Sequence, residues 1–213
     1  MKVRSISLIA LCLCLLSPAV HAQITKGNFL LGGSLGFSSG HTSSLYDYSS
    51  TPYKVKQSSV SLSPNVSYFV IDHLSLGVVT PLLHTSYKPE GNEKKTTYTT
   101  YSIGPLIRYY FPLGSHWAIF PEASYSYGWA VTKGSSYSSG GYVPKTYHGD
   151  TRNLQGGLGL VYFLNHNIGV EGKFRYQALR NTYERDDLLL DHIDNDSFDF
   201  TIGLQVYLLR NTQ

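Results

Sequence analysis

Apolar and polar residues alternate along residues 197–208 with a period of two. The even positions from Phe198 to Leu208 are all apolar, whereas the odd positions from Asp199 to Tyr207 are mostly polar or small. Because successive side chains of a β-strand point to opposite faces, this pattern predicts a strand with one apolar and one polar face. Alternation over about twelve residues is typical of a strand that crosses a membrane as part of a barrel wall.

Seven further segments show the same alternation. It is sharpest in residues 58–70 and least regular in residues 74–87, where Val79 and Leu83 fall on the polar face. The expected strands are residues 27–38, 58–70, 74–87, 96–111, 116–130, 151–164, 168–177 and 197–208. Short breaks at 71–73, 112–115 and 165–167 alternate with long loops at 39–57, 88–95, 131–150 and 181–196. The sequence therefore predicts an all-β fold, an eight-stranded antiparallel up-and-down transmembrane β-barrel.

A soluble β-sandwich is the alternative fold, because its strands alternate in the same way. A sandwich buries its apolar faces against each other and leaves its polar faces in water. In this chain the polar faces consist mostly of Ser, Gly and Thr with a few charges of opposite sign. Such residues suit a narrow, packed lumen better than open water, so the barrel is favoured.

The N-terminus has the features of a secretory signal peptide. Two basic residues precede the apolar run of residues 6–16, and small residues follow up to Ala22. The run is too short for a membrane-spanning helix, which needs about 20 apolar residues. We expect cleavage after Ala22, so that residues 1–22 are the signal peptide and residues 23–213 form the barrel domain.

Composition excludes several classes of function. Cys12 and Cys14 lie within the signal, each preceded by Leu rather than by the small residue of a lipoprotein, so no disulfide or cysteine site is expected in the mature chain. Without the two basic residues of the signal, 15 Lys and Arg stand against 14 Asp and Glu, a balance that does not suit nucleic-acid binding. The 18 Tyr, 9 Phe and 2 Trp suit the aromatic girdles of a membrane barrel.

The signal peptide, the eight strands and a final strand containing Thr201, Gly203, Val206 and Leu208 resemble the small outer-membrane β-barrel proteins of the OmpA transmembrane-domain and OmpX kind. The resemblance implies a monomer in the outer membrane, in contact with lipid and lipopolysaccharide, with four extracellular loops and periplasmic termini. Those four residues are similar to the signal that the barrel-assembly machinery reads in this family. Members usually end on an aromatic residue, whereas this chain continues through residues 209–213.

The inward positions predict a network of ion pairs that fills the lumen. Arg108 and Glu122 are nearly equidistant from the turn at 112–115 and should meet across the hairpin, while Gly157 and Gly159 leave room for charges on the next strand. The expected network consists of Arg108, Glu122, Glu171, Lys173 and Arg175. An eight-stranded barrel is just wide enough to be filled by side chains, and a gated polar pore is the alternative.

One pattern points to an enzyme. His84 and Ser86 share a face, where the imidazole could act as a general base for the hydroxyl, and they weakly resemble the motif of outer-membrane lipid A deacylases. The facing strand offers Thr97, Thr99 and Tyr101 but no carboxylate to orient the histidine. We therefore treat a lipid A modifying enzyme as an alternative function only.

Two loops are rich in Tyr, Ser and Gly, as antibody binding sites are, which suggests an extracellular protein or glycan ligand. The candidate contacts are Tyr46, Tyr48, Tyr53, Tyr137, Tyr142 and Tyr147. The last long loop is acidic, and its carboxylates could in principle bind a divalent cation, although the spacing of an EF-hand is absent. The acidic residues concerned are Asp186, Asp187, Asp191, Asp194 and Asp196.

These observations together favour a non-enzymatic role in envelope integrity or in surface binding and adhesion, with no cofactor. The alternatives are the lipid A modifying enzyme and a small-solute channel.

Overall fold

The protein is described here as a computed structural model that covers residues 23–44, 53–90, 95–138, 141–183 and 192–209. All regular elements in these ranges are strands. They are β1 (Phe29–Ser44), β2 (Tyr53–Ile71), β3 (Leu74–Val79), β4 (Leu82–Pro89), β5 (Thr96–Tyr109), β6 (Phe111–Leu113), β7 (Trp117–Ser138), β8 (Gly141–Phe163), β9 (Ile168–Tyr183) and β10 (His192–Leu208). In this part of the chain, no helix is long and apolar enough to cross a membrane.

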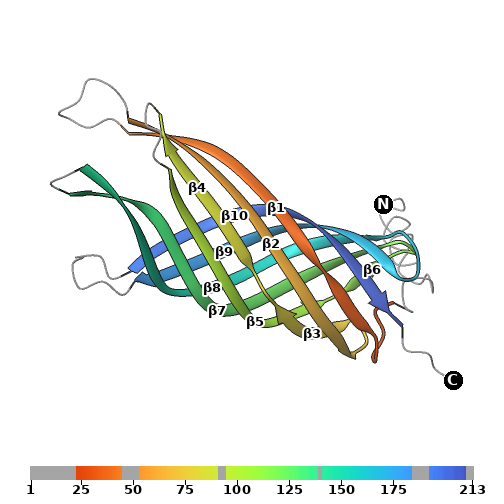
Figure 1. The fold of residues 1–213 in the computed structure, drawn as a ribbon. Coiled ribbons are helices and arrows are strands. Elements are labelled where there is room, and N and C mark those ends of the chain that lie inside the picture. Colours follow the sequence, from red (N-terminus) through yellow and green to blue (C-terminus); the bar gives the residue numbers. More distant parts are fainter. Residues whose placement is uncertain (1–22, 45–52, 91–94, 139–140, 184–191, 210–213) are drawn as a thin grey trace, which may run out of the picture.

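The strands form one closed antiparallel barrel with eight walls (Figure 1). Strands β3 and β4 make a single wall, because both pair with β2 on one side and with β5 on the other. Strand β5 and the short β6 likewise make one wall, because both pair with β7, so the ten strands form eight walls. The interruption between them contains Pro81, which has no backbone N–H to donate to the ladder. Pairing of β1 with β10 closes the ring, and the predicted eight-stranded barrel is confirmed.

Short turns lie at one end of the barrel, which we call the turn end. They fall at residues 72–73, 114–116 and 164–167, as the sequence predicted. His73 and Gly114 have φ values of 69° and 77°, the left-handed conformation that tight reversals use. The opposite end, where the described strands stop before residues 45–52, 91–94, 139–140 and 184–191, we call the loop end.

The strands reach further toward the loop end than their apolar stretches indicated. Prediction of a long loop at 131–150 was wrong, because β7 and β8 continue as a paired hairpin up to Ser138 and Gly141. The predicted loops at 39–57 and 181–196 likewise begin and end as strand. Alternation stops where a strand leaves the membrane, since water can wet both faces there, so hydrophobic pattern marks the bilayer rather than the end of pairing.

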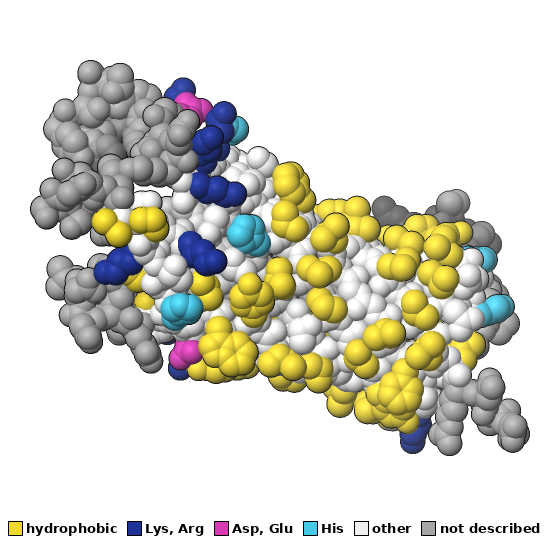
Figure 2. Space-filling model, viewed as in Figure 1, with side chains coloured by type: hydrophobic (Ala, Val, Ile, Leu, Met, Phe, Trp, Pro, Cys, Tyr) yellow, Lys and Arg dark blue, Asp and Glu magenta, His cyan; other side chains and the backbone are white. Residues whose placement is uncertain are grey.

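The outward faces carry the apolar side chains. On the face seen in Figure 2 they form a broad band, with most of the visible Lys, Arg and Asp or Glu side chains beyond it toward the loop end. Tyr109 and Trp117 lie in the band near the turn end, and Tyr101 and Trp129 pair across β5 and β7 nearer the loop end, as expected of aromatic girdles. On β10, Phe198, Phe200 and Ile202 are exposed while Thr201 and Gln205 are buried, which agrees with the predicted faces.

Candidate functional site

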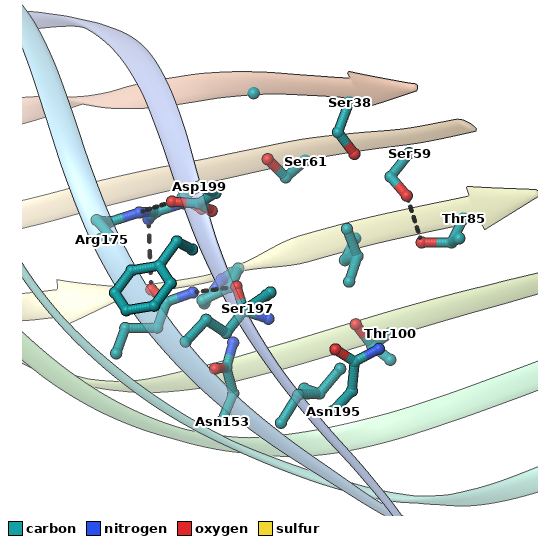
Figure 3. A pocket seen from close by; sticks show the side chains of 18 of the residues that line it. Ser38, Ser59, Ser61, Thr85, Thr100, Asn153, Arg175, Asn195, Ser197 and Asp199 are labelled. Atoms are coloured by element: carbon teal, nitrogen blue, oxygen red, sulfur yellow. Dashed lines mark hydrogen bonds and ion pairs between the residues drawn. The ribbon is translucent and has the colours of Figure 1, made fainter. Parts of the chain in front are cut away.

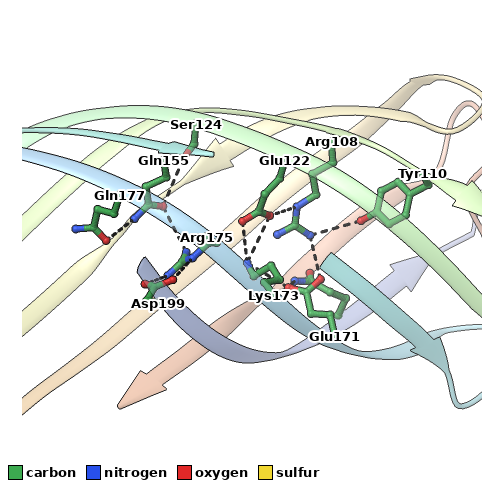
Figure 4. Close-up of polar contacts among 11 residues, drawn as sticks. Arg108, Tyr110, Glu122, Ser124, Gln155, Glu171, Lys173, Arg175, Gln177 and Asp199 are labelled. Carbon is green, nitrogen blue, oxygen red and sulfur yellow. Dashed lines mark hydrogen bonds and ion pairs between the residues drawn. The ribbon is translucent and has the colours of Figure 1, made fainter. Parts of the chain in front are cut away.

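Two buried cations and two buried carboxylates form a layer across the lumen (Figure 4). Arg108 Nε lies 3.0 Å from Glu122 Oε2, and an Nη atom of the same guanidinium lies 3.3 Å from Glu171 Oε2. Lys173 Nζ lies 3.3 Å from the other oxygen of each carboxylate. All four side chains are at least nine-tenths buried, so each charge depends on its partners rather than on water.

Strand register explains how this layer is built. Arg108 and Glu122 are direct partners across β5 and β7, and Glu171 and Lys173 follow at a period of two on β9. A Cβ added to Gly203 on β10 would lie 2.7 Å from Glu171 Cγ and collide with it. Glycine at this position therefore leaves the space that the Glu171 side chain occupies. The structure thus brings together the charged residues that the sequence singled out.

Arg175 forms a second ion pair, on the loop-end side of the first layer. Its Nη2 and Nε atoms lie 2.7 and 3.0 Å from the two oxygens of Asp199, a bidentate arrangement. The remaining Nη donates to Gln155 Oε1 at 3.4 Å, and Gln155 in turn donates to Gln177 at 3.1 Å. The cations Arg108, Lys173 and Arg175 are therefore balanced by the anions Glu122, Glu171 and Asp199.

Asp199 was missed as a member of the network. It occupies a polar-face position of the last strand and is the direct partner of Arg175 across β9 and β10. The short turn at 165–167 joins β8 to β9, so counting residues from it does not give the register of β9 with β10. Those two strands are joined at the loop end instead. The glycine argument was right for Gly157, whose Cβ would lie 2.9 Å from Arg175 Cα, but Gly159 makes room for the Phe120 ring instead.

An apolar layer closes the lumen on the turn-end side of the charges. Its buried side chains are Ile24, Leu30, Phe69, Tyr110, Ala118, Phe120, Val161, Phe163 and Tyr207. The Tyr110 and Phe120 ring centroids lie 5.0 Å apart, and the Arg108 guanidinium lies 5.1 Å from the Phe120 centroid, so the apolar and charged layers are in contact.

Residues 23–28 cover this layer at the turn end. Ile24 inserts its side chain into the apolar layer, and its carbonyl accepts a hydrogen bond of 2.8 Å from the His73 N–H. The Gln23 amide donates to Asn165 O at 2.8 Å, and the Lys26 N–H donates to Asp72 Oδ1 at 2.8 Å. The sequence-based prediction missed this layer because it treated the inner face as uniformly polar. Apolar residues at the inward positions of the strand ends could have indicated it.

On the loop-end side of Arg175 the lumen is hollow. A cavity of about 370 Å³ is lined mainly by Ser, Thr, Asn and Gln from both sides of the barrel. Ser59 and Thr85 share a hydrogen bond of 3.0 Å across its wall, and the Arg175–Asp199 pair forms its floor. The lumen is therefore packed in one half and open in the other.

His84 and Ser86 lie on β4 without forming a catalytic pair. The exposed His84 shares a hydrogen bond of 2.8 Å with Thr99, between Nδ1 and Oγ1. Thr99 is the cross-strand partner of His84 on β5. Among the described residues, His84 has no hydrogen bond to Ser86 and no ion pair with a carboxylate. In the described part of the chain, the imidazole is thus hydrogen-bonded to a threonine rather than to Ser86.

The remaining predicted sites lie at the margins of the described chain. Tyr46 and Tyr48 fall outside it. The backbones of Tyr53, Tyr137 and Tyr142 lie in β2, β7 and β8. The Lys145 ammonium lies 5.2 Å from the Tyr147 ring centroid. Asp186, Asp187 and Asp191 also fall outside it. Arg180 donates to both oxygens of Asp194, at 2.7 and 2.8 Å, and no cluster of three metal-ligating side chains occurs among the described residues.

The residues of the predicted assembly signal divide between the two faces of β10. Thr201 and Gly203 point into the lumen, Val206 is half-buried, and Leu208 is exposed on the outer face. The structure therefore gives each residue a place in the barrel wall and leaves the signal itself as a prediction.

Comparison with known proteins identifies the family of this chain. No curated protein has a matching sequence. Similar solved structures include OprG from Pseudomonas aeruginosa (13% identity, 87% of this chain and 98% of that one, TM-score 0.43) and Ail from Yersinia pestis (13%, 86% and 100%, TM-score 0.39). Neisserial surface protein A is another (17%, 85% and 97%, TM-score 0.39). A family model for the outer membrane protein beta-barrel domain matches residues 8–207, so the chain belongs to that family and is an outer-membrane protein.

Proposed function

We propose that this protein is a non-enzymatic outer-membrane barrel that is plugged by its own side chains. The observation that carries the proposal is the pair of packed layers in the turn-end half, one charged and one apolar, which meet at Arg108 and Phe120. Hydrated ions would have to displace buried ion pairs and a cluster of aromatic rings in order to pass. Residues 23–28 add a third barrier at the turn end.

A plugged barrel acts through its surfaces rather than through its lumen. The extended hairpin of β7 and β8 carries Tyr137, Tyr142 and Tyr147 beyond the apolar band, where they would contribute to binding of an extracellular protein or glycan. The band itself would contact lipid and lipopolysaccharide. We infer a role in envelope integrity or in surface binding, with the protein acting as a monomer.

The orientation of the barrel and the processing of the chain are part of the same proposal. Cleavage after Ala22 would make Gln23 the first residue, and the Gln23 amide, which donates to Asn165 O, would then hold the new N-terminus at the turn end. We propose that the turn end and both termini are periplasmic and that Thr201, Gly203, Val206 and Leu208 are read by the barrel-assembly machinery. N-terminal sequencing of protein purified from outer membranes tests the cleavage site, and a sequence that does not begin at Gln23 contradicts it.

Single-channel recording in planar bilayers tests the plug. The purified protein is expected to give no steady conductance for hydrated ions. A triple variant, Phe120→Ala with Glu122→Ala and Lys173→Ala, thins both layers while it keeps the net charge, and it should conduct. Ser124→Ala, on the same strand but on the loop-end side of the layers, is the matched control and should stay silent.

Two outcomes would contradict the plug. Steady conductance of the unaltered protein would favour the small-solute channel. A folded triple variant that remains silent would mean that the two layers are not the barrier. Folding of each variant is checked by its heat-dependent mobility on a gel.

A further inference from the structure

The barrel wall between β1 and β10 is paired only in its turn-end half. Pairing runs from Phe29 with Leu208 to Leu35 with Ile202 and stops there. Both strands nevertheless continue toward the loop end, β1 paired with β2 as far as Ser44 and β10 paired with β9 from His192. Residues 36–44 and 193–201 thus face each other as two strand edges that have no partner across the gap within the described chain, and Figure 1 shows the two strands diverging.

The divergence leaves real space inside the wall. Gly40 lies in the part of β1 that has lost β10, and a Cβ added to it would meet no atom within 4 Å. Ser38, two residues earlier on the same face, lines the cavity of about 370 Å³ and is exposed, whereas Ser34, on the same face in the paired half, is buried. We call the gap between residues 36–44 and 193–201 the open seam.

The cavity and the open seam form one continuous site. Figure 3 shows the polar side chains of the cavity, including Ser38, Ser59 and Asn195, beside the diverging strands. The same cavity is also lined by Phe37, Phe198 and Phe200, which lie on the outer face and are 72%, 68% and 62% exposed. Leu82, on the outer face of the paired β4 wall, also lines the cavity, so the three phenylalanines are assigned to the open seam by their place along its two edges.

The chemistry of this site matches an amphiphile. On the outer side are three phenyl rings within the lipid-facing band. On the inner side are neutral hydrogen-bonding groups, and the charges of Arg175 and Asp199 already satisfy each other. Asn153 is 4% exposed, lines the cavity, and its Oδ1 has no hydrogen-bond partner among the described residues.

Only the part of the open seam nearest the paired half, residues 36–38 and 197–201, lies within the apolar band, whereas residues 39–44 and 193–196 lie beyond it and can be hydrated. Backbone groups in hydrocarbon are costly unless they are hydrogen-bonded, so lipid tails alone cannot fill that part of the seam favourably. A cavity of this size lies at the small end of the range for ligand pockets, which suits one chain and a small head better than a two-chain phospholipid.

We propose that the open seam binds a single-chain amphiphile with an uncharged, hydrogen-bonding head group, which enters from the surrounding lipid. Its chain lies along Phe37, Phe198 and Phe200, and its head reaches the polar wall near Ser59, Thr85 and Asn153. The site goes beyond the plugged-barrel function, and it is a dead end because the charged and apolar layers close the lumen beneath it.

Photolabelling in vesicles tests this site. The full-length processed protein is reconstituted in phosphatidylcholine vesicles that contain a monoacylglycerol with a diazirine next to its head group. After irradiation, labelled residues are mapped by mass spectrometry. We expect labels on inward residues of the cavity, such as Ser61 and Thr100, which bulk lipid cannot reach through a paired wall.

Two adjacent residues provide a matched pair of variants. Ser38→Trp places an indole inside the open seam and should reduce labelling of the inward residues by about tenfold or more, equivalent to about 1.4 kcal/mol of binding. Ser39→Trp adds the same indole to the outer face of the same strand and should leave that labelling unchanged. Should Ser38→Trp fail to fold, Asn153→Leu replaces it, because it removes from the cavity wall the Oδ1 atom that has no hydrogen-bond partner among the described residues.

The proposal fails if labels in the unaltered protein are confined to outward residues such as Ile202, which is ordinary lipid contact. It also fails if Ser38→Trp, or Asn153→Leu in its place, is labelled inside the barrel as strongly as Ser39→Trp. Neither result bears on the plug, because the conductance experiment measures that separately.

Discussion

The two halves of this barrel share their strands but differ in how they fill the space between them. In the turn-end half every wall is paired, and the lumen is occupied by aromatic rings and by four interlocked charges. In the loop-end half the wall between β1 and β10 is open, and the lumen holds a cavity of about 370 Å³. One half therefore resists passage, and the other presents an unfilled polar surface.

The two halves differ in the inward side chains that fill the lumen. Near the turn end, long side chains such as Arg108 and Phe120 reach across the lumen and contact one another. The inward positions of β1 are Ser and Gly in both halves, with Gly32 and Ser34 where β1 pairs with β10 and Ser38 and Gly40 where it does not. The size of the inward residues of β1 therefore does not by itself explain why pairing ends at Leu35 and Ile202.

Removal of one buried charge in the turn-end half should have the largest effect on stability. Glu171→Ala leaves Arg108 and Lys173 with one carboxylate between them in a dry lumen. Breaking a buried pair in this way typically costs about 3–5 kcal/mol, because the remaining charge is uncompensated. The measurement is the free energy of unfolding from urea titration of the protein in phospholipid vesicles.

Arg180→Ala is the matched control at the loop end. Arg180 also makes a bidentate ion pair, with Asp194, but both side chains are about half exposed. Water can solvate the remaining carboxylate, so the free energy of unfolding should hardly change. Equal losses in the two variants would mean that the turn-end charges are not sealed from water.

The next largest effect should come from a charge on the lipid face of the last paired position. Ile202 is 60% exposed on the outer surface of β10, and Ile202→Arg should destabilise by about 2–4 kcal/mol if it lies near the middle of the bilayer. Ser197→Arg, on the inner face of the same strand, reaches the polar cavity and water instead of lipid and should be tolerated. The same urea titration compares the two, and equal tolerance would show that the faces are misassigned.

The sequence predicted the barrel well because membrane walls impose a strict period. The eight walls, the three turns and the faces of β10 all follow from alternation that lipid on one side and lumen on the other require. The prediction of a loop at 131–150 failed, because β7 and β8 continue there beyond the bilayer. There the backbone still pairs, but no lipid demands an apolar face, so the pattern that marks a strand is lost.

The candidate site could be predicted only in part, for reasons of distance along the chain. Arg108 and Glu122 were found because a short turn fixes their register, whereas Asp199 and Arg175 are joined through the loop end. The open seam could not have been foreseen at all. Residues 36–44 and 193–201 lie at opposite ends of the chain, and the residue pattern of neither segment indicates that pairing stops at Leu35.

The smallest expected effects compare two glycines on the inner face of β1. Gly32 lies in the paired half, where a Cβ would overlap Gln205 and the Leu204 carbonyl of β10. Gly32→Ala should therefore push the two strands apart and destabilise by about 1–3 kcal/mol, as overpacking usually does. A loss below this range would mean that the strands can separate easily even where they are paired.

Gly40→Ala makes the same change in the open seam and should act in the opposite direction. The added methyl group meets no atom within 4 Å, and the backbone at Gly40 does not have a positive φ, so the folded state is not strained. Alanine restricts the unfolded chain more than glycine does, which should stabilise the protein by about 0.4–1 kcal/mol. If Gly40→Ala instead destabilised the protein as much as Gly32→Ala, β10 would have to lie against Gly40, and the two halves of the barrel would be equally closed.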